Sequence, residues 1–284
     1  MMLEEVMEML DSLIGLDSVK QKLKAWVETV KTSKEQKNKD ISYNLVFIGN
    51  PGIGKTAVAR LMGQIYRALG ILSDGIVIEV NRNDLIGMYV GQTAIKTQDM
   101  WERAKGQVLV VDEADTLYGE NQWDFGNEAL DTLLALMDND GDDHVVILSG
   151  YPENMFKFLK ACPGVCARFG FDLEEYDDFN KLSKSNLDSL VNLILFDDYT
   201  AEEMYEIFKK LCEKYQYDYA ENVELAVKEY FGKVCAENSK EFQNARGVRN
   251  FFQEIIARQA QRVNLIDNPT KEDLCTFFLE DLPF

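Results

Sequence analysis

Residues 45–61 read LVFIGNPGIGKTAVARL, an apolar run followed by a glycine-rich loop and a helical pattern. The run at residues 45–48 is typical of a short strand buried on both faces, as in parallel sheets. The loop fits G-x-x-x-x-G-K-S/T, and residues 55–68 continue as a helix that Gly70 is placed to end. Glycines let backbone N–H groups close around an anion, and the helix N-terminus adds partial positive charge. This order predicts a phosphate-binding loop.

Lys55 and Thr56 carry the chemistry of this loop. The lysine can reach the β- and γ-phosphates of a nucleoside triphosphate, and the threonine hydroxyl can ligate Mg²⁺. Average residue usage makes a chance match in a chain of this length of order one per hundred. The alternative is a glycine-rich turn with a solvated lysine, which the flanking strand and helix disfavour. The residues expected to contact nucleotide here are Asn50, Pro51, Gly52, Ile53, Gly54, Lys55, Thr56 and Ala57.

A second pattern supports the first. The apolar run at residues 108–111 delivers Asp112 and Glu113 at its end. Open α/β sheets bind ligands at the carboxyl ends of their strands, so both carboxylates are expected beside the phosphate loop. We expect Asp112 to hold Mg²⁺, directly or through water, and Glu113 to polarise the attacking water. Alone, the pair would indicate only the start of a polar loop. After the phosphate loop, it predicts a nucleoside triphosphatase.

The order of elements up to residue 198 predicts an α/β domain. A helical period covers about residues 18–37, before the first strand. Further short apolar runs lie at residues 76–80, 108–111 and 145–148, with helical sequence between them. Strands that alternate with helices predict a doubly wound parallel sheet.

After Thr200 the sequence indicates helices alone. A capping box at residues 200–203 opens a helix that runs to about residue 214. Amphipathic stretches follow at about residues 222–235 and 248–263. We therefore expect two domains. They are an α/β domain at residues 1–198 and a small all-helical domain at residues 199–284.

Composition limits the classes of partner. Of 284 residues, 46% are hydrophobic and 28% charged, which excludes wholesale disorder. A formal charge of −19 disfavours nucleic acid and anionic lipid as partners. Five cysteines and one histidine lack the spacing of a disulfide framework or a zinc site. There is no signal-peptide pattern and no run of about 18 apolar residues, so we expect a cytoplasmic protein without a membrane span.

Several segments, in this order, resemble the AAA+ ATPases. They are residues 14–16 (IGL), the phosphate loop, residues 112–114 (DEA) and residues 244–250 (NARGVRN). Residues 84–93 (DLIGMYVGQT), 145–151 and 162–164 are similar to the branch of that family containing the rubisco activase CbbX and stage V sporulation protein K. The resemblance implies ATP and Mg²⁺ as cofactors. It also implies a homo-oligomeric, hexameric ring that uses ATP to remodel or thread a protein substrate.

The resemblance also implies roles for two arginines. Arg168 follows the Pro-Gly element where the family places its arginine finger, which reaches the γ-phosphate of the neighbouring subunit. Such a finger can raise the rate by a factor of roughly 10³ or more. Arg249 matches the sensor-2 arginine, which links the helical domain to bound nucleotide. Without the family context, both residues would be interpreted as surface arginines.

Three further nucleotide contacts rest on the same resemblance. The family has a polar sensor-1 residue at the end of the fourth strand, which is Ser149 or Tyr151 here, with Ser149 preferred. Ile14 and Gly15 would lie near the adenine, where apolar contact and backbone hydrogen bonds suffice.

Tyr89, Val90 and Gly91 match the aromatic–hydrophobic–glycine pattern of the family's central pore loop. An aromatic ring can bind a polypeptide that moves past it through apolar contact and stacking, which require little of the sequence of that polypeptide. The alternative is a tyrosine packed at the edge of the core. Residues 118–125, with Gly119, Trp123 and Asp124, occupy the place of a second pore loop.

One segment departs from the family. The resemblance implies that the run near residue 193 is the fifth strand of the sheet, and about twenty extra acidic-rich residues, at about 170–191, separate Arg168 from it. An insertion beside the finger puts its placement in doubt. The segment is interpreted as a partner-specific element, an interface lock or a tolerated surface loop, since loop length changes stability only slowly.

Three functions compete. The leading interpretation is an ATP-driven remodeller that acts as an oligomeric ring on a protein. A nucleotide-switched assembly scaffold would bind ATP and recruit partners without threading. A DNA-associated loader is disfavoured by the acidic balance and by the lack of a recognisable helix-turn-helix or zinc module.

Overall fold

The computed structural model describes residues 2–36, 41–119, 124–139, 143–171, 190–237 and 241–284. These residues divide into two compact units. The first unit comprises Met1–Gly49 and Gly54–Phe196, and the second comprises Asn50–Ile53 and Asp197–Phe284. The opening residues of the predicted phosphate loop therefore belong to the same unit as the C-terminal helices. Most of the predicted insertion, at 172–189, lies outside the described residues.

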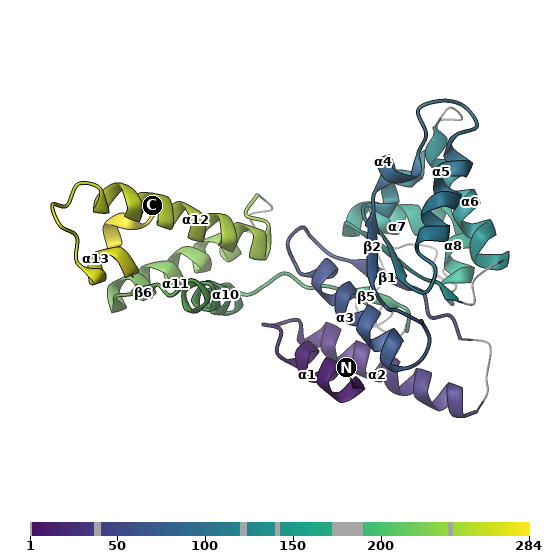
Figure 1. The fold of residues 1–284 in the computed structure, drawn as a ribbon, viewed down its shortest axis with the longest axis horizontal. Helices are drawn as coiled ribbons and strands as arrows, with labels where there is room; N and C mark the ends of the chain where they lie inside the picture. Colours follow the sequence, from purple (N-terminus) through teal and green to yellow (C-terminus); the bar gives the residue numbers. More distant parts are fainter. Residues whose placement is uncertain (1, 37–40, 120–123, 140–142, 172–189, 238–240) are drawn as a thin grey trace. The chain divides into compact units, whose positions relative to one another are not determined.

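A five-stranded parallel sheet forms the centre of the first unit, in the order β2-β3-β4-β1-β5 (Figure 1). Its strands are β1 (Leu45–Ile48), β2 (Val77–Val80), β3 (Val108–Val111), β4 (Val145–Gly150) and β5 (Leu193–Leu195). Ile48 pairs with Gly150 and Val111 pairs with Leu148, so the strand ends that carry the predicted site lie at one edge of the sheet. The predicted parallel α/β sheet is confirmed.

Helices surround this sheet. They are α1 (Leu3–Asp11), α2 (Asp17–Glu35), α3 (Lys55–Ala68), α4 (Arg82–Leu85), α5 (Thr93–Arg103), α6 (Phe125–Asn139), α7 (Pro152–Ala161) and α8 (Pro163–Arg168), with the 3-10 turn η1 (Ala114–Leu117). Helix α1 was not anticipated from the sequence. It buries Val6 and Leu10 and packs against α3.

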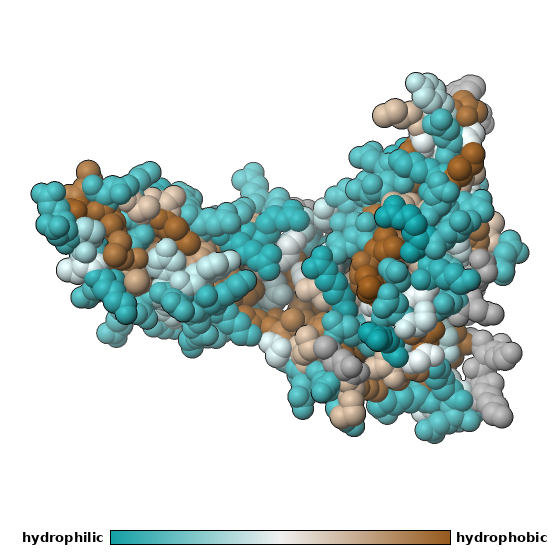
Figure 2. All heavy atoms as spheres, viewed as in Figure 1, coloured by the Kyte–Doolittle hydropathy of each residue, from teal (hydrophilic) through white to brown (hydrophobic). Residues whose placement is uncertain are grey.

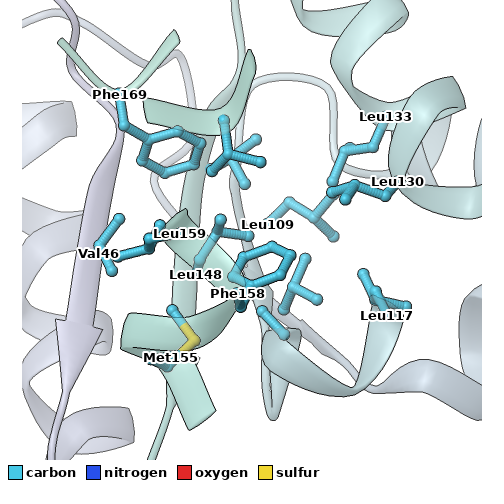
Figure 3. Close-up of a cluster of buried hydrophobic side chains, with 14 of the residues drawn as sticks. Val46, Leu109, Leu117, Leu130, Leu133, Leu148, Met155, Phe158, Leu159 and Phe169 are labelled. Atoms are coloured by element: carbon cyan, nitrogen blue, oxygen red, sulfur yellow. The ribbon is translucent and has the colours of Figure 1, made fainter. Parts of the chain in front are cut away.

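The two faces of the sheet are covered by different helices. Val46, Leu109 and Leu148 face a cluster completed by residues of α5 to α8, including Phe158 (Figure 3). Successive strand side chains alternate between faces. Leu45 and Phe47 accordingly point to the opposite face, where α2 and α3 lie. Apolar side chains fill both faces, which is why most strands consist of uninterrupted apolar runs.

Strand β2 is the exception because it lies at an edge of the sheet. Val77 and Ile78 are only half-buried and Glu79 is exposed, whereas β1 and β3 are buried throughout. Ile76, the first residue of the expected strand, is 55% exposed and precedes the observed one. The short apolar run predicted the strand correctly but could not show its edge position.

The second unit is mainly helical. Its C-terminal elements are α10 (Ala201–Tyr215), α11 (Glu221–Ala236), α12 (Asn244–Val263), α13 (Lys271–Cys275) and the 3-10 turn η4 (Leu279–Asp281), with a short parallel ladder of β6 (Asp218–Tyr219) and β7 (Thr276–Phe277). The predicted capping box forms, since the Glu203 N–H donates to the Thr200 hydroxyl (3.2 Å) and the Thr200 N–H to the Glu203 carboxylate (2.7 Å).

A buried polar residue ties distant parts of the first unit together. The Asn192 side chain accepts a hydrogen bond from the Trp26 indole N–H (3.2 Å). Its amide group donates to the carbonyls of Ser42 (3.0 Å) and Phe169 (2.8 Å). Asn192 is 7% exposed, so water cannot readily replace these partners. Buried polar groups that lose their partner destabilise a fold more than exposed ones do.

We predict that Asn192→Leu lowers the free energy of unfolding by about 2–4 kcal/mol, because it leaves the Trp26 N–H and two carbonyls without their amide partner. Urea denaturation followed by tryptophan fluorescence measures this, since Trp26 and Trp101 are buried in the first unit. Asn139→Leu is the matched control, because Asn139 is exposed at the end of α6. Equal stability of the two variants would contradict the role given to Asn192.

Candidate functional site

The phosphate-binding loop joins β1 to α3. The Gly49 N–H donates to the Gly150 carbonyl (3.2 Å), which fixes the start of the loop to β4. Gly54 occupies the N-cap of α3 with φ +105°, a conformation that residues with a side chain rarely adopt. A glycine N-cap has no side chain to bond to the first N–H groups of α3. These donors, and the positive end of the helix dipole, suit an anion.

Lys55 is held at the first turn of α3. Its Nζ donates to the Gly49 carbonyl (2.6 Å) and lies over the ring of Tyr151, 5.3 Å from the ring centroid. Thr56 is half-buried, and Ala57 is exposed on the next positions of the helix. The lysine therefore already lies beside the loop in the structure, where a phosphate would compete with the Gly49 carbonyl for it.

Asp112 and Glu113 follow β3 at the same edge of the sheet. Strand β4 lies between β1 and β3, so its C-terminal residues separate the loop from the two carboxylates. The Ser149 hydroxyl donates to Asp112 Oδ1 (3.0 Å). The Tyr151 hydroxyl lies 2.9 Å from Glu113 Oε1. Both residues considered for the sensor-1 position thus contact a carboxylate, and each contacts a different one.

Glu113 has a left-handed backbone. Its φ is +51°, which is uncommon for a residue with a side chain. The turn η1 holds it there, because both the N–H (2.9 Å) and the hydroxyl (2.6 Å) of Thr116 donate to the Glu113 carbonyl. Backbone conformations of this kind persist when surrounding contacts fix them, and they often occur at functional sites.

The residues present suit Mg²⁺ in a nucleotide complex. Within the described part of the chain, no group of three or more His, Cys, Asp or Glu residues could hold a metal ion. Mg²⁺ typically takes one or two protein ligands together with phosphate oxygens and water, so it needs no such cluster. Thr56 offers a hydroxyl, and the hydrogen bond from Ser149 orients the carboxylate of Asp112.

Asp115 extends the site in a way that the sequence did not suggest. Its carboxylate lies near the Asn154 side chain and the backbone of Tyr151, where η1 packs against α7, and among the described residues its buried Oδ1 has no hydrogen-bond partner. Burial raises the pKa of Asp115, and the charge of Glu113 adds to this rise. A carboxylate two residues after Glu113 is easily interpreted as part of a polar loop, so only the structure shows this link.

Arg168, the predicted finger, bonds to acceptors of its own chain. Its Nε donates to Asp138 Oδ1 (2.9 Å) and to the Leu134 carbonyl (3.1 Å), and its Nη1 donates to the Gly164 carbonyl (2.8 Å). A second nitrogen pairs with the other oxygen of Asp138. Arg168 therefore does not extend freely from α8. No sequence pattern indicated Asp138, which lies thirty residues earlier on α6.

The predicted pore residues lie in the loop between α4 and α5 (Figure 1). Met88, Tyr89 and Val90 are 91%, 70% and 85% exposed, so the alternative of a tyrosine packed against the core does not hold. Gly91 has φ +80° and open space around it. The loop begins at Gly87, where an added Cβ would overlap the Gln92 side chain. The apolar tip is thus presented to solvent.

Arg82 connects this region to the turn after Glu113. It donates to the Thr116 carbonyl in η1 and forms an ion pair with Asp124. This pair is the main reason that the pKa of Asp124 is lowered. Residues 120–123 of the second predicted pore segment, Trp123 among them, lie outside the described residues. Arg82 thus joins the base of one predicted pore loop to the end of the other.

Ile14 and Gly15 lie in the turn between α1 and α2. Gly15 and Leu16 have φ values of +57° and +58°, so the chain reverses sharply there. Both predicted residues are half-buried. The contact between α1 and α3 places this N-terminal segment on the helix that follows the phosphate loop.

The opening residues of the loop pack within the second unit. Gly52 has φ +73°, and an added Cβ would overlap the Gln243 carbonyl oxygen. The Ala245 N–H donates to the Gly52 carbonyl (3.2 Å). Arg246 also lies against Gly52, whereas the predicted sensor-2 residue Arg249 is exposed one turn further along α12. Arg246 belongs to the same segment as Arg249, but no sequence pattern indicated its contact with Gly52.

The surface is mostly hydrophilic in the view of Figure 2, as expected from the net charge. Among the described residues, no helix is both long enough and apolar enough to cross a membrane.

Two family models match the chain. The model of the ATPase family associated with various cellular activities (AAA) matches residues 45–172, and that of the AAA lid domain matches residues 200–284. A point mutant of RuvB from Thermotoga maritima has a similar fold, with a TM-score of 0.54 and 17% identity over 93% of this chain and 70% of that one.

Curated proteins match over nearly the whole chain. Stage V sporulation protein K of Bacillus subtilis (strain 168) is 33% identical over 99% of this chain and 82% of its own length. Protein CbbX of Cereibacter sphaeroides is 34% identical over 92% and 79%, and the chloroplastic ribulose bisphosphate carboxylase/oxygenase activase of Cyanidioschyzon merolae (strain NIES-3377 / 10D) is 34% identical over 99% and 91%. With this site geometry and these relatives, the chain belongs to the AAA family of ATPases and is related to CbbX and stage V sporulation protein K.

Proposed function

We propose that this ATPase binds Mg-ATP at the loop around Lys55 and works as an oligomeric ring that pulls on a protein. The observation that carries the first part is the shared contact of Lys55 and Glu113 with Tyr151. One side chain thereby brings the phosphate-binding lysine and the proposed general base to the same edge of the sheet.

Each residue has a role that follows from its chemistry. Lys55 neutralises charge on the β- and γ-phosphates, and Glu113 accepts a proton from the attacking water. Thr56 and Asp112 would hold Mg²⁺, which supplies charge neutralisation at the phosphate oxygens when it is bound. Ser149 orients Asp112, and Tyr151 orients Glu113, through the hydrogen bonds described above. Ile14, Gly15 and Arg249 complete the proposed nucleotide contacts.

A ring is proposed because the family resemblance gives Arg168 a role between subunits. For that, its guanidinium must leave Asp138 and reach the γ-phosphate of a neighbouring copy. Arginine forms similar paired hydrogen bonds with carboxylate and phosphate, so the two partners compete for one donor set. A hexamer is the ring size that the family resemblance favours. A nucleotide-switched scaffold would not need this exchange.

A protein substrate is proposed from the exposed apolar tip at Met88, Tyr89 and Val90. Solvent-exposed apolar groups gathered in one loop indicate a contact surface. In a ring located in the cytoplasm, this tip would grip an unfolded segment of a client protein.

Glu113→Gln should bind ATP as tightly as the unchanged chain while kcat falls by about 100-fold or more, because the amide cannot accept the proton of water. Lys55→Ala should instead lose most of its ATP affinity. Equilibrium binding and steady-state turnover separate these effects. Rapid hydrolysis by the Glu113→Gln variant would refute the role of Glu113.

Mixing two inactive variants tests whether Arg168 acts on the nucleotide of a neighbouring subunit. Arg168→Ala lacks the finger, and Glu113→Gln lacks the base, so each homo-oligomer should turn over slowly. Mixed oligomers should regain activity, because a Glu113→Gln subunit can offer Arg168 to the intact base of its neighbour. Turnover is measured across mixing ratios, with Arg168→Lys as a conservative comparison. If co-assembled mixtures stay inactive, the trans role is wrong.

Tyr89→Ala should keep ATP turnover within about twofold and lose protein binding, because the loop lies outside the carboxylate site. Protein that co-purifies with the Glu113→Gln variant in ATP is compared with and without the added Tyr89→Ala change. Ile95→Ala is the control, because Ile95 is also exposed but lies on α5. If the added Tyr89→Ala change leaves the amount of co-purified protein unchanged, the pore proposal is wrong and the nucleotide-switched scaffold is favoured.

A further inference from the structure

A polar network inside the second unit holds the first residue of the phosphate loop that belongs to this unit. The Asn50 amide donates to both carboxylate oxygens of Asp198, at 3.0 and 2.8 Å. The Asn244 amide donates to the same carboxylate at 2.8 Å. Asp198 is thus the common acceptor for two side chains that lie far apart in the sequence. A charged acceptor makes these bonds stronger than neutral ones.

Asn244 is well fixed in this network. It is 7% exposed, and its Oδ1 accepts a hydrogen bond from the Tyr199 N–H (3.0 Å). Its amide also points at the Pro51 carbonyl, 3.4 Å away. The side chain therefore contacts the loop, Asp198 and the segment leading to α10.

The backbone at this point is unusual as well. Gln243 and Asn244 are consecutive residues with φ values of +58° and +54°. Such conformations are unfavourable for residues with a side chain, and they persist when the surroundings fix them. They aim the Gln243 carbonyl at Gly52, so close that no Cβ would fit there. Asparagine tolerates this conformation better than most residues.

We infer that Asp198 and Asn244 are positioning residues for ATP binding. Together they hold Asn50–Ile53 in the shape in which the loop N–H groups can face the phosphates. The inference rests on the proposed function, since it requires that the loop bind the nucleotide. Binding is stronger when the donors are already ordered, because less conformational entropy is lost on association.

The negative charge of Asp198 opposes the gain in ATP affinity that comes from ordering the loop. Asp198 is negative and bonds to the phosphate loop, so by repulsion alone its removal would favour an anionic nucleotide. Positioning predicts the reverse, a weaker affinity for ATP. The sign of the change in KM therefore separates the two effects. Asn244→Gly gives an independent measure, because it keeps the backbone conformation and the net charge while removing the side chain.

We would measure kcat and KM for Mg-ATP in Asp198→Ala, Asn244→Gly and Asn50→Ala, each in the full chain. Removing one donor side chain from the network is worth about a factor of five, and removing the acceptor that two side chains share is worth about twice that. KM should rise about tenfold in Asp198→Ala and about fivefold in the others, with kcat within about twofold. Asp197→Ala is the matched control, since it removes an exposed neighbouring charge and should leave KM unchanged or slightly lower.

The double variant Asn50→Ala/Asp198→Ala gives the decisive comparison. If Asp198 acts through Asn50, the KM of the double variant should equal that of Asp198→Ala. If the two substitutions act independently, their effects should multiply and raise KM about fifty-fold. Multiplied effects would overturn the inference by showing that Asp198 does not act through Asn50. A lowered Tm with unchanged KM would overturn it by leaving Asp198 as a merely structural residue. Lys55→Ala is assayed in parallel. If it retains normal ATP affinity, the proposed function fails instead.

Discussion

The pairing of β4 between β1 and β3 is the constraint that creates the site. Parallel pairing fixes the register, so Ile48, Val111 and the end of β4 reach one edge of the sheet together. The residue after β4 then has two neighbours, the lysine that follows β1 and the glutamate that follows β3. Tyr151 contacts both, through its ring and its hydroxyl. With a different strand order, the loop that carries Lys55 and the segment that carries Glu113 could both be present in the sequence and still lie far apart in the fold.

Much of the first unit could be predicted because its signals are local. A buried parallel strand needs a run of apolar residues, and a phosphate loop needs glycines at positions of positive φ, as Gly52 and Gly54 show. The capping box at Thr200 is equally local, since its partners lie three residues apart. Patterns of this kind indicate an element without knowledge of its neighbours.

The unpredicted side-chain partners of Arg168 and Trp26 are distant from them in the chain. Asp138 is thirty residues from Arg168, and Asn192 is 166 residues from Trp26. Neither partner has a distinctive sequence context, because an aspartate or asparagine near the end of an element is ordinary. Asp198 and Asn244 are a similar case. The motif around Lys55 predicted where phosphate would bind, but it did not indicate which side chains hold the loop in shape.

In the proposed ring, the ion pair of Arg168 with Asp138 would affect how a neighbouring subunit is bound. A guanidinium that leaves a carboxylate for a phosphate exchanges one anionic partner for another of similar geometry. The net change in free energy is then much smaller than for a cation taken from water into an empty site. In the proposed ring, contact between subunits would therefore form and break readily, as required of an enzyme that releases its neighbour in each cycle of hydrolysis.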